Sequence, residues 1–363
     1  MSDIGKVFGE LTRQVLNGTM LSRAQAESII EQVTDDHLLD LCCGASRIRD
    51  HYLGREVRCC SIAAAKVGKC SEDCAFCSQS AHYETHVPGQ SVLQAEEVVR
   101  ASREAVANGA LCFGIVNSGL GPTDAEIEAW GPTFQQIAEE GHIGVGASMG
   151  VLNERQARRL AELGVRRYNH NLQTSRRHFP NIIGTHGYDD RLATLRHLKA
   201  AGVELCTGAL FGMGETWADR LDLAFELREL DPVVVPVNFL IPIPGTPLDN
   251  LPPLSPNECL MILAVYRFLL PHQLITVAGG RETQLRDMQS WIFAAGATGF
   301  LVGNYLTTCG RAAETDHRMV LDLGLEMKRY RQTAGEPGPA AARSLTVLSP
   351  MSAGRPCASQ MSP

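Results

Sequence analysis

The chain has 363 residues, of which 44% are hydrophobic and 20% are charged, and its formal net charge is −7 at pH 7. A chain of this length can bury a full core, as one large domain or as two ordinary ones. The acidic balance argues against nucleic acid as a partner, and the apolar runs are too short to cross a membrane. These bulk properties favour a soluble protein that acts on small molecules.

The first residues carry no apolar core of the signal-peptide kind, so we expect a cytoplasmic protein. Its twelve cysteines should then stay reduced and available to metal. Residues 1–40 are predicted to form an N-terminal helical extension. Val7, Leu11 and Val15 recur at helical spacing, and Ser22 with Gln25 forms a capping box for a second helix.

Residues 41–332 show a rhythm of short apolar runs and amphipathic segments. Eight runs are predicted to be strands: 55–62, 110–118, 143–149, 166–173, 203–211, 233–241, 274–279 and 298–304. Eight helices are expected at 92–108, 124–139, 153–163, 188–201, 216–230, 255–270, 282–295 and 314–329. This alternation predicts an α/β fold, a (β/α)8 TIM-type barrel. An open doubly wound sheet is the alternative, but no G-x-G-x-x-G turn follows the first run to support it.

Three cysteines, Cys70, Cys74 and Cys77, follow the first run at C-x3-C-x2-C spacing. Thiolate is the ordinary ligand of iron–sulfur clusters, and three thiolates leave one iron of a [4Fe–4S] cube open for another ligand. A structural zinc site is usually closed by four ligands. The other interpretations are a zinc site completed by a distant residue and three reduced structural cysteines.

Polar residues also occur where the predicted strands end. In a barrel such residues gather at one face, where catalytic groups are found. Polar side chains are costly to bury without partners, so we expect a ligand-filled cavity there. The residues are Asn117, Ser118, Asn169, Asn171, Gln173, Cys206, Asn238 and Asn304.

Residues 333–363 form a tail rich in Pro, Gly, Ala and Ser, without helical or strand periodicity. We expect this tail to be disordered.

The cysteine motif, with Phe76 before its last cysteine, resembles the signature of the radical S-adenosylmethionine (SAM) enzymes. Longer strings resemble the biotin synthase family, in the family's order, from about residue 55 to about residue 325. They include GKCSEDC at 68–74, YNHNL at 168–172, GMGET at 212–216, PVNFL at 236–240, PGTPL at 244–248 and GNYLTT at 303–308.

The resemblance implies a [4Fe–4S] cluster on the three cysteines and SAM as the source of a 5′-deoxyadenosyl radical. It implies dethiobiotin as the substrate and the insertion of sulfur between two saturated carbons as the reaction. The sulfur would come from an auxiliary iron–sulfur cluster, [2Fe–2S] or of another type, deeper in the barrel. Flavodoxin or ferredoxin as the reductant and a homodimeric state follow from the same resemblance.

The resemblance also assigns roles to residues. Arg191 should pair with the SAM carboxylate, and Asn171 and Gln173 should also contact SAM, while Asn169, Asn171 and Asn238 should hold the substrate. The family has an acid at position 173 that binds the ribose hydroxyls, and glutamine lacks its charge, so weaker SAM binding is expected. From residue type alone, Arg191 could be a solvated helix residue and each asparagine a turn or cap residue.

The auxiliary-cluster ligands depart from the family's pattern. One branch of the family uses three cysteines and an arginine, of which Cys206 alone matches. A second branch has a cysteine that matches Cys60. The other ligand positions of the two branches are occupied here by Gly114, Gly146, Thr276 and Ala278. Our hypothesis is that Cys60, Cys206 and Cys112 hold a modified cluster. The alternative is that these cysteines are small core residues.

Two other functions fit parts of the pattern. A related radical SAM enzyme, similar to a hydrogenase maturase, would share the barrel and the three cysteines without needing a sulfur donor. An iron–sulfur electron carrier belongs to a different class and would need four cysteines to saturate its cube.

Overall fold

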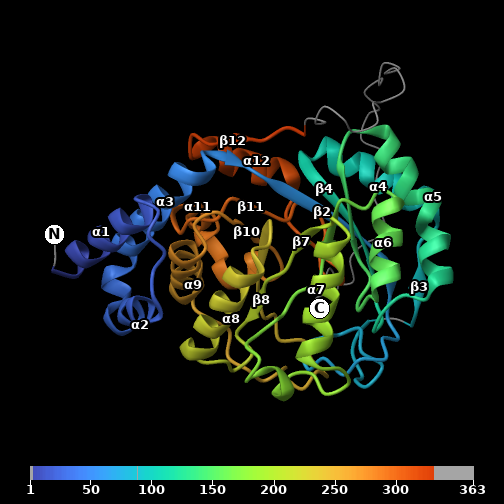
Figure 1. Ribbon diagram of the computed structural model, residues 1–363, viewed down its shortest axis with the longest axis horizontal. Coiled ribbons are helices and arrows are strands. Elements are labelled where there is room, and N and C mark those ends of the chain that lie inside the picture. Colours follow the sequence, from blue (N-terminus) through green and yellow to red (C-terminus); the bar gives the residue numbers. More distant parts are fainter. Residues whose placement is uncertain (1–2, 88, 331–363) are drawn as a thin grey trace, which may run out of the picture.

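The computed structural model describes residues 3–87 and 89–330 (Figure 1). Its central feature is a curled sheet in which all but one of the strand pairs are parallel. The strands of this sheet are β2 (Cys59–Val67), β3 (Ser91–Val92), β4 (Ala110–Asn117), β5 (Gly144–Ser148), β6 (Arg167–Asn169), β7 (Glu204–Cys206), β8 (Ala209–Phe211), β9 (Val234–Phe239), β10 (Leu274–Val277) and β11 (Gly299–Phe300). A separate parallel pair consists of β1 (Glu56–Val57) and β12 (Glu326–Met327).

The strands follow one another around the sheet in the order β2, β4, β5, β6, β7, β9, β10 and β11, and β8 continues from β7 alongside β9. The two ends of this series meet. A parallel bridge joins Cys60 to Leu301, and the Val302 amide donates to the Cys60 carbonyl at 2.9 Å. The structure therefore confirms the predicted barrel, with a strand in each of the eight runs, and the open doubly wound sheet is wrong.

Glycine makes this closure possible. A Cβ atom at Gly299 would lie 1.7 Å from the carbonyl oxygen of Arg58, so a side chain at this position would push β11 away from the chain before β2. The backbone of Arg58 also donates to the Thr298 carbonyl at 2.8 Å. Close backbone approach of this kind is a recognised use of glycine.

Helices cover the outside of the sheet (Figure 1). They are α4 (Ala95–Ala107), α5 (Asp124–Glu140), α6 (Glu154–Glu162), α7 (Tyr188–Ala200), α8 (Trp217–Leu230), α9 (Pro256–Leu269), α10 (Arg281–Leu285), α11 (Trp291–Ala294) and α12 (Ala313–Asp322), with short 3-10 turns at Asp35–His37, Phe179–Asn181 and Arg286–Met288. Their apolar faces pack on the strands, so that Phe113 of β4 and Phe134 of α5 are both at most 1% exposed. The first six predicted helices are confirmed as α4 to α9.

The last two predicted helices differ from the structure. The segment 282–295 is not one helix, because Arg286 takes a left-handed backbone conformation with φ of 49°, which a right-handed helix cannot continue through. The segment 314–329 is helical only as far as Asp322; the chain then turns at Gly324 and enters β12, which pairs with β1.

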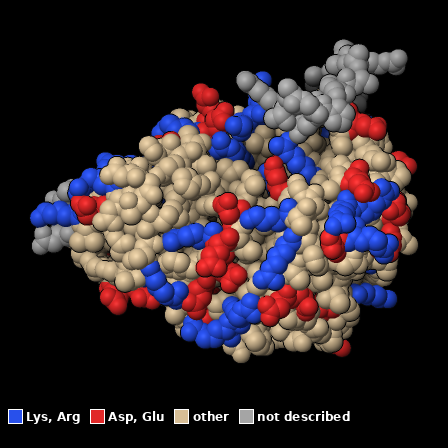
Figure 2. Space-filling model, viewed as in Figure 1, with Lys and Arg blue, Asp and Glu red and all other residues tan. Residues whose placement is uncertain are grey.

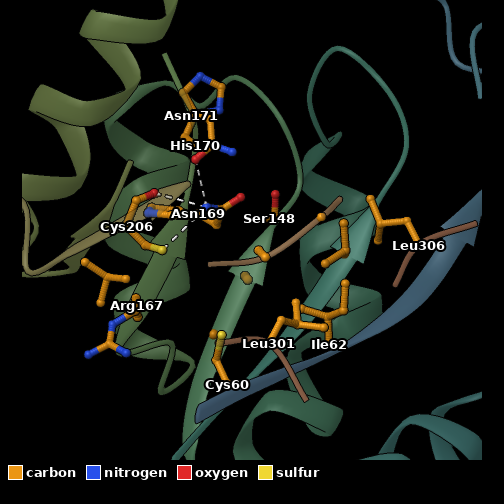
Figure 3. Close-up of a pocket in the computed structure, with 18 of the residues that line it drawn as sticks. Cys60, Ile62, Ser148, Arg167, Asn169, His170, Asn171, Cys206, Leu301 and Leu306 are labelled. Atoms are coloured by element: carbon orange, nitrogen blue, oxygen red, sulfur yellow. Dashed lines mark hydrogen bonds between the residues drawn. The ribbon is translucent and has the colours of Figure 1, made fainter. Parts of the chain in front are cut away.

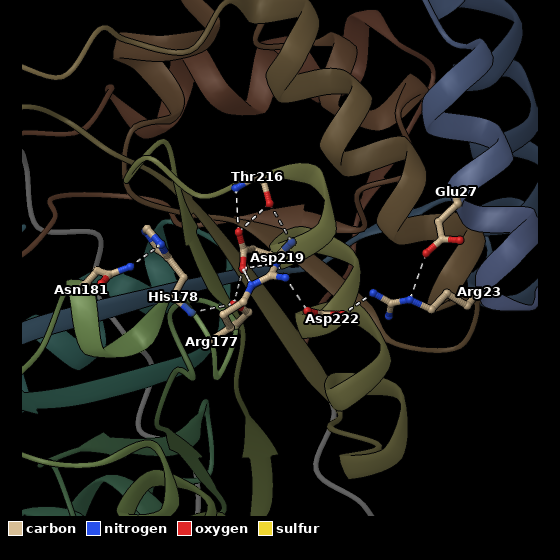
Figure 4. A network of polar contacts seen from close by, with 9 residues as sticks. Arg23, Glu27, Arg177, His178, Asn181, Thr216, Asp219 and Asp222 are labelled. Atoms are coloured by element: carbon tan, nitrogen blue, oxygen red, sulfur yellow. Dashed lines mark hydrogen bonds and ion pairs between the residues drawn. The ribbon is translucent and has the colours of Figure 1, made fainter.

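The N-terminal helices are α1 (Asp3–Leu16), α2 (Arg23–Gln32) and α3 (Leu38–Leu53), and they lie beside α9 and α8 (Figure 1). The predicted capping box is confirmed, since the Ser22 amide donates to the Gln25 side chain at 2.9 Å. Arg23 pairs with Asp222 of α8 and with Glu27, which fixes α2 to the barrel (Figure 4). The domain division at residue 40 falls inside α3 and remains a prediction, and the predicted disordered tail lies outside the described residues.

Acidic and basic side chains alternate over the face shown in Figure 2. Ion pairs link neighbouring helices there and elsewhere, for example Arg159 of α6 with Glu128 of α5 at 2.6 Å. Within residues 3–87 and 89–330, no helix has the length and apolar character needed to span a membrane.

Candidate active site

A cavity of about 670 Å³ lies inside the barrel (Figure 3). Glycines at 114, 144 and 146 line its wall, where the interior of a packed barrel would carry branched side chains. All but one of the residues that the sequence analysis assigned to the site line this one cavity: Cys60, Cys70, Cys74, Cys77, Cys112, Asn117, Ser118, Asn169, Asn171, Gln173, Arg191, Cys206 and Asn238. The expectation for Asn304 is wrong, because this residue is exposed and accepts from the Gly310 amide.

The loop with Cys70, Cys74 and Cys77 follows β2 at one end of the cavity. Gly68 and Lys69 both take left-handed conformations, with φ of 81° and 48°, and so turn the chain out of the strand. The Cys70 amide then donates to the Gln79 carbonyl at 2.9 Å, which closes the loop. This local geometry holds three thiols, 4 and 3 positions apart, against the cavity.

All three cysteines of this loop are half-buried. Burial raises the pKa of Cys74 to about 12, although the nearby Arg191 guanidinium opposes the rise, and burial also raises the pKa of Cys77. Within the described ranges, no three His, Cys, Asp or Glu side chains converge on a single-ion position. Ligands of a cube bind different irons and lie farther apart than ligands of one ion, so this donor set of three thiols fits three corners of a [4Fe–4S] cluster.

Arg191 is not a solvated helix residue. It is 8% exposed, and its Nη1 donates to the backbone carbonyl of Asn171 at 2.7 Å. Its guanidinium also packs over the ring of Phe179, 5.6 Å from the centroid. The buried Nε atom has no hydrogen-bond partner among the described residues. A buried cation that faces a cavity with an unused donor can bind a carboxylate.

Strand β6 is shorter than the predicted run 166–173, because it ends at Asn169. Beyond it the Asn171 side chain accepts from the Gly208 amide at 3.1 Å. Gln173 then takes a left-handed conformation with φ of 71° and forms an isolated bridge with Ala209. Strain of this kind in a residue other than glycine is characteristic of binding sites.

Two of the three asparagines that the resemblance assigns to the substrate, Asn169 and Asn238, already make hydrogen bonds within the protein. Asn169 Nδ2 lies 3.2 Å from Asn171 Oδ1 and 3.4 Å from Cys206 Sγ. Asn238 Nδ2 donates to the Ala209 carbonyl at 3.0 Å, and its Oδ1 accepts from the Gly279 amide at 2.9 Å. A side-chain amide can make four hydrogen bonds, so Asn238 keeps one donor and one acceptor position for a ligand.

Cys60, Cys112 and Cys206 lie deeper in the cavity. Cys60 and Cys112 are partners in the register of β2 and β4. Burial raises the pKa of all three thiols, in the case of Cys206 to about 11, and the neighbouring Cys206 and Cys112 raise that of Cys60 further. A Cβ atom at Gly146 would lie 3.2 Å from Cys112 Sγ, so this glycine gives the thiol its room.

Sequence reasoning missed four polar residues that line the same cavity. Arg167 lies on β6, near Cys206 (Figure 3). Its charge also acts on Cys112. Glu72, His170 and His186 lie near Arg191, and each of the two imidazoles has a buried Nε2 without a partner in the described part of the chain. The one available signal was the polar character of the predicted strand 166–173, in which all residues except Tyr168 and Leu172 are polar.

Comparisons with known proteins agree with this geometry. The model of the radical SAM superfamily matches residues 66–227, and that of the biotin and thiamin synthesis associated domain matches residues 236–326. The biotin synthase of Citrifermentans bemidjiense is 44% identical over 321 residues, which cover 88% of this chain and 98% of that protein. The biotin synthase of Syntrophotalea carbinolica is 47% identical over 321 residues, with the same coverage of 88% and 98%.

Solved structures show the same fold at low identity. Methylornithine synthase superposes with a TM-score of 0.77 at 20% identity, covering 88% of this chain and 97% of its own. The FeFe-hydrogenase maturase HydG from Carboxydothermus hydrogenoformans gives a TM-score of 0.74 at 19% identity, covering 88% and 78%. These likenesses concern the fold alone.

The curated relatives are enzymes, so the electron-carrier alternative is wrong. The family uses a [4Fe–4S] cluster and SAM, and the three thiols and Arg191 of this cavity fit both groups. The chain belongs to the biotin synthase family of radical SAM enzymes.

Proposed function

We propose that this protein is a biotin synthase that inserts sulfur into dethiobiotin to form biotin. One observation carries the proposal: three loop thiols with a buried arginine and three deeper thiols line the same cavity. A radical can therefore be generated at one end of this cavity and a sulfur source held at the other.

Cys70, Cys74 and Cys77 would hold the [4Fe–4S] cluster and leave one iron open for SAM. When bound, this cluster supplies the electron that splits SAM into methionine and a 5′-deoxyadenosyl radical. Arg191 would bind the SAM carboxylate, because its planar guanidinium matches two carboxylate oxygens and its Nε is unused. Asn171 and Gln173 would complete the SAM contacts.

The substrate would lie between the two groups of thiols. Dethiobiotin carries a cyclic urea with both donors and acceptors, which side-chain amides can match. Asn169, Asn171 and Asn238 line the cavity at this level and are fixed by hydrogen bonds to neighbouring strands. Such fixed amides can orient the saturated carbons from which hydrogen is removed.

The sulfur source would be an auxiliary cluster held by Cys60, Cys112 and Cys206. The residues present fit such a group, because three thiols face a space that glycines at 114 and 146 leave open. The Arg167 guanidinium adds a positive charge beside these thiols, which favours a negatively charged cluster. We further propose a flavodoxin or ferredoxin as the reductant and a homodimer as the active state.

An anaerobic assay with SAM, a reductant and dethiobiotin tests the proposal. The expected products are biotin and 5′-deoxyadenosine. Deoxyadenosine without biotin would keep the radical chemistry and reject sulfur insertion. Iron and sulfide analysis of active protein should show iron for two clusters in each chain, and iron for one cluster in active enzyme would reject the auxiliary site.

A further inference from the structure

The cluster loop is bound to the segment that leads into α7. Two carboxylates make this connection, Glu72 and Asp73, which stand between Cys70 and Cys74 in the sequence. Both accept hydrogen bonds from residues 184–186, which lie 111 to 114 positions farther along the chain. The connection therefore joins the loop of the proposed cluster to the helix that carries Arg191.

Asp73 binds the backbone of this segment. Its Oδ1 accepts from the Gly184 amide at 2.9 Å and from the Thr185 amide at 3.1 Å. A Cβ atom at Gly184 would lie 2.8 Å from Asp73 Oδ2, so the approach depends on glycine. The Ala75 amide adds a backbone bond to the Ile182 carbonyl at 2.9 Å.

Glu72 binds side chains of the same segment. Its Oε2 lies 2.5 Å from His186 Nδ1 and 2.7 Å from the Thr185 hydroxyl. The side chains of Glu72 and His186 are only 8% and 6% exposed. A carboxylate ion only accepts hydrogen bonds, so Nδ1 carries a proton in this contact and the imidazole ring is held in one orientation. A buried charge is stable only where hydrogen bonds replace water, which makes this contact specific.

The held imidazole packs against the support of Arg191. His186 meets the Phe179 ring edge to face, with 5.9 Å between centroids. The Arg191 guanidinium lies over the same ring, and its Nη1 is bonded to the Asn171 carbonyl. A chain of direct contacts thus runs from Glu72 through His186 and Phe179 to the guanidinium.

We propose that Glu72 and Asp73 are positioning residues that hold the cluster loop at a fixed spacing from Arg191. The inference rests on the proposed function, in which one SAM molecule binds to both the cluster and Arg191. Two anchors bind one ligand tightly only when their separation is set before the ligand arrives. Neither carboxylate has to touch SAM for this role.

The test compares Glu72→Ala, Glu72→Gln and Thr185→Val in anaerobically reconstituted holoenzyme. Iron and sulfide content should stay at the wild-type level. The dissociation constant for SAM should rise about tenfold in Glu72→Ala, and less in Glu72→Gln because an amide oxygen still accepts from His186. In the absence of SAM, the EPR spectrum of the reduced cluster in Glu72→Ala should match that of wild type. In the presence of SAM, the two spectra should differ.

Asp189→Asn is the matched control. Asp189 is 77% exposed on the first turn of α7 and pairs with Arg176, so this variant removes a nearby negative charge without touching the connection. Its SAM affinity should stay within about twofold of wild type, as expected for an exposed ion pair.

Three outcomes would count against the inference. Wild-type affinity and spectra in Glu72→Ala would overturn it. Loss of the cluster in all three variants would also overturn it, since the contact would then serve cluster assembly. A wild-type spectrum that does not respond to SAM would reject the proposed function, and this inference with it.

Discussion

Arg167 and Glu204 form an ion pair inside the barrel, with Nε and Nη2 of the arginine 3.0 and 2.5 Å from the same carboxylate oxygen. The two residues are register partners on β6 and β7. Glu204 thus fixes the guanidinium beside Cys112 and Cys206, where its positive charge acts on both thiols and lowers their pKa against the effect of burial.

This arrangement predicts a phenotype for Arg167→Leu. The change removes the positive charge beside the thiols and leaves Glu204 with the Arg166 ion pair, which disfavours an anionic cluster at the thiols. Iron and sulfide should fall from two clusters to one in each chain, and deoxyadenosine formation should persist. Arg100→Leu is the control, because Arg100 is 68% exposed on α4. Full iron content in Arg167→Leu would contradict the prediction.

The deeper thiols can be tested in the same way. Cys60→Ala and Cys206→Ala should each abolish biotin formation while the radical cluster and SAM cleavage remain. Cys259→Ala provides a matched control, because Cys259 is fully buried in α9 and belongs to the helical core. It should lower stability by about 1 kcal/mol and leave both clusters in place. Biotin formation by Cys206→Ala would show that this thiol is a core residue only.

Gln173→Glu should tighten SAM binding by about tenfold, because a charged acceptor binds ribose hydroxyls more strongly than a neutral one. The left-handed backbone at this position, with φ of 71°, is compatible with either side chain, so folding should be unaffected. Titration calorimetry on the holoenzyme measures the effect, and Gln173→Ala should weaken binding. Unchanged or weaker affinity in Gln173→Glu would refute the assigned role.

Asn238→Asp should raise the KM for dethiobiotin by about tenfold and leave SAM affinity unchanged. The aspartate still accepts from the Gly279 amide, but it loses the donor that binds the Ala209 carbonyl and the second donor that faces the ligand. Steady-state kinetics with each substrate in turn separate the two effects. An equal loss of affinity for SAM would show a general disturbance of the cavity instead.

The Asp219 carboxylate should make a pH-dependent contribution to the stability of the folded protein. Burial raises its pKa, but hydrogen bonds from Thr216, Ser175 and Arg177 outweigh burial and hold the pKa below the ordinary value (Figure 4). The folded-state pKa is lower than the unfolded one, so the stabilisation is complete above about pH 4 and is lost as the pH falls through the folded pKa.

Asp219→Asn should therefore lower the free energy of unfolding by about 2 kcal/mol at pH 7, and the difference should shrink below about pH 4. Urea unfolding followed by circular dichroism measures it. Asp222 is a more exposed neighbour and pairs with Arg23. Asp222→Asn should therefore lower the free energy of unfolding by less than about 1 kcal/mol. A deficit for Asp219→Asn that persists undiminished to pH 3 would contradict this assignment.

The alternation of apolar runs and amphipathic segments was sufficient to predict the barrel, because the burial pattern of each strand and helix is visible in its own stretch of sequence. The same reasoning failed at 282–295, where the left-handed Arg286 interrupts a helical pattern. It failed again after Asp322, where the pairing of β12 with the distant β1 overrides the local helical signal.

By itself the sequence determined the kind of chemistry, since three thiols within eight residues need no distant contact to form a cluster site. It also named the positions that line the cavity, through strings shared with a family. Only the tertiary structure decided which charges act on those thiols. Arg167 meets Glu204 across 37 positions, and Glu72 meets His186 across 114. Such pairs leave no local periodicity, because the strands and loops that carry them become neighbours only when the barrel closes.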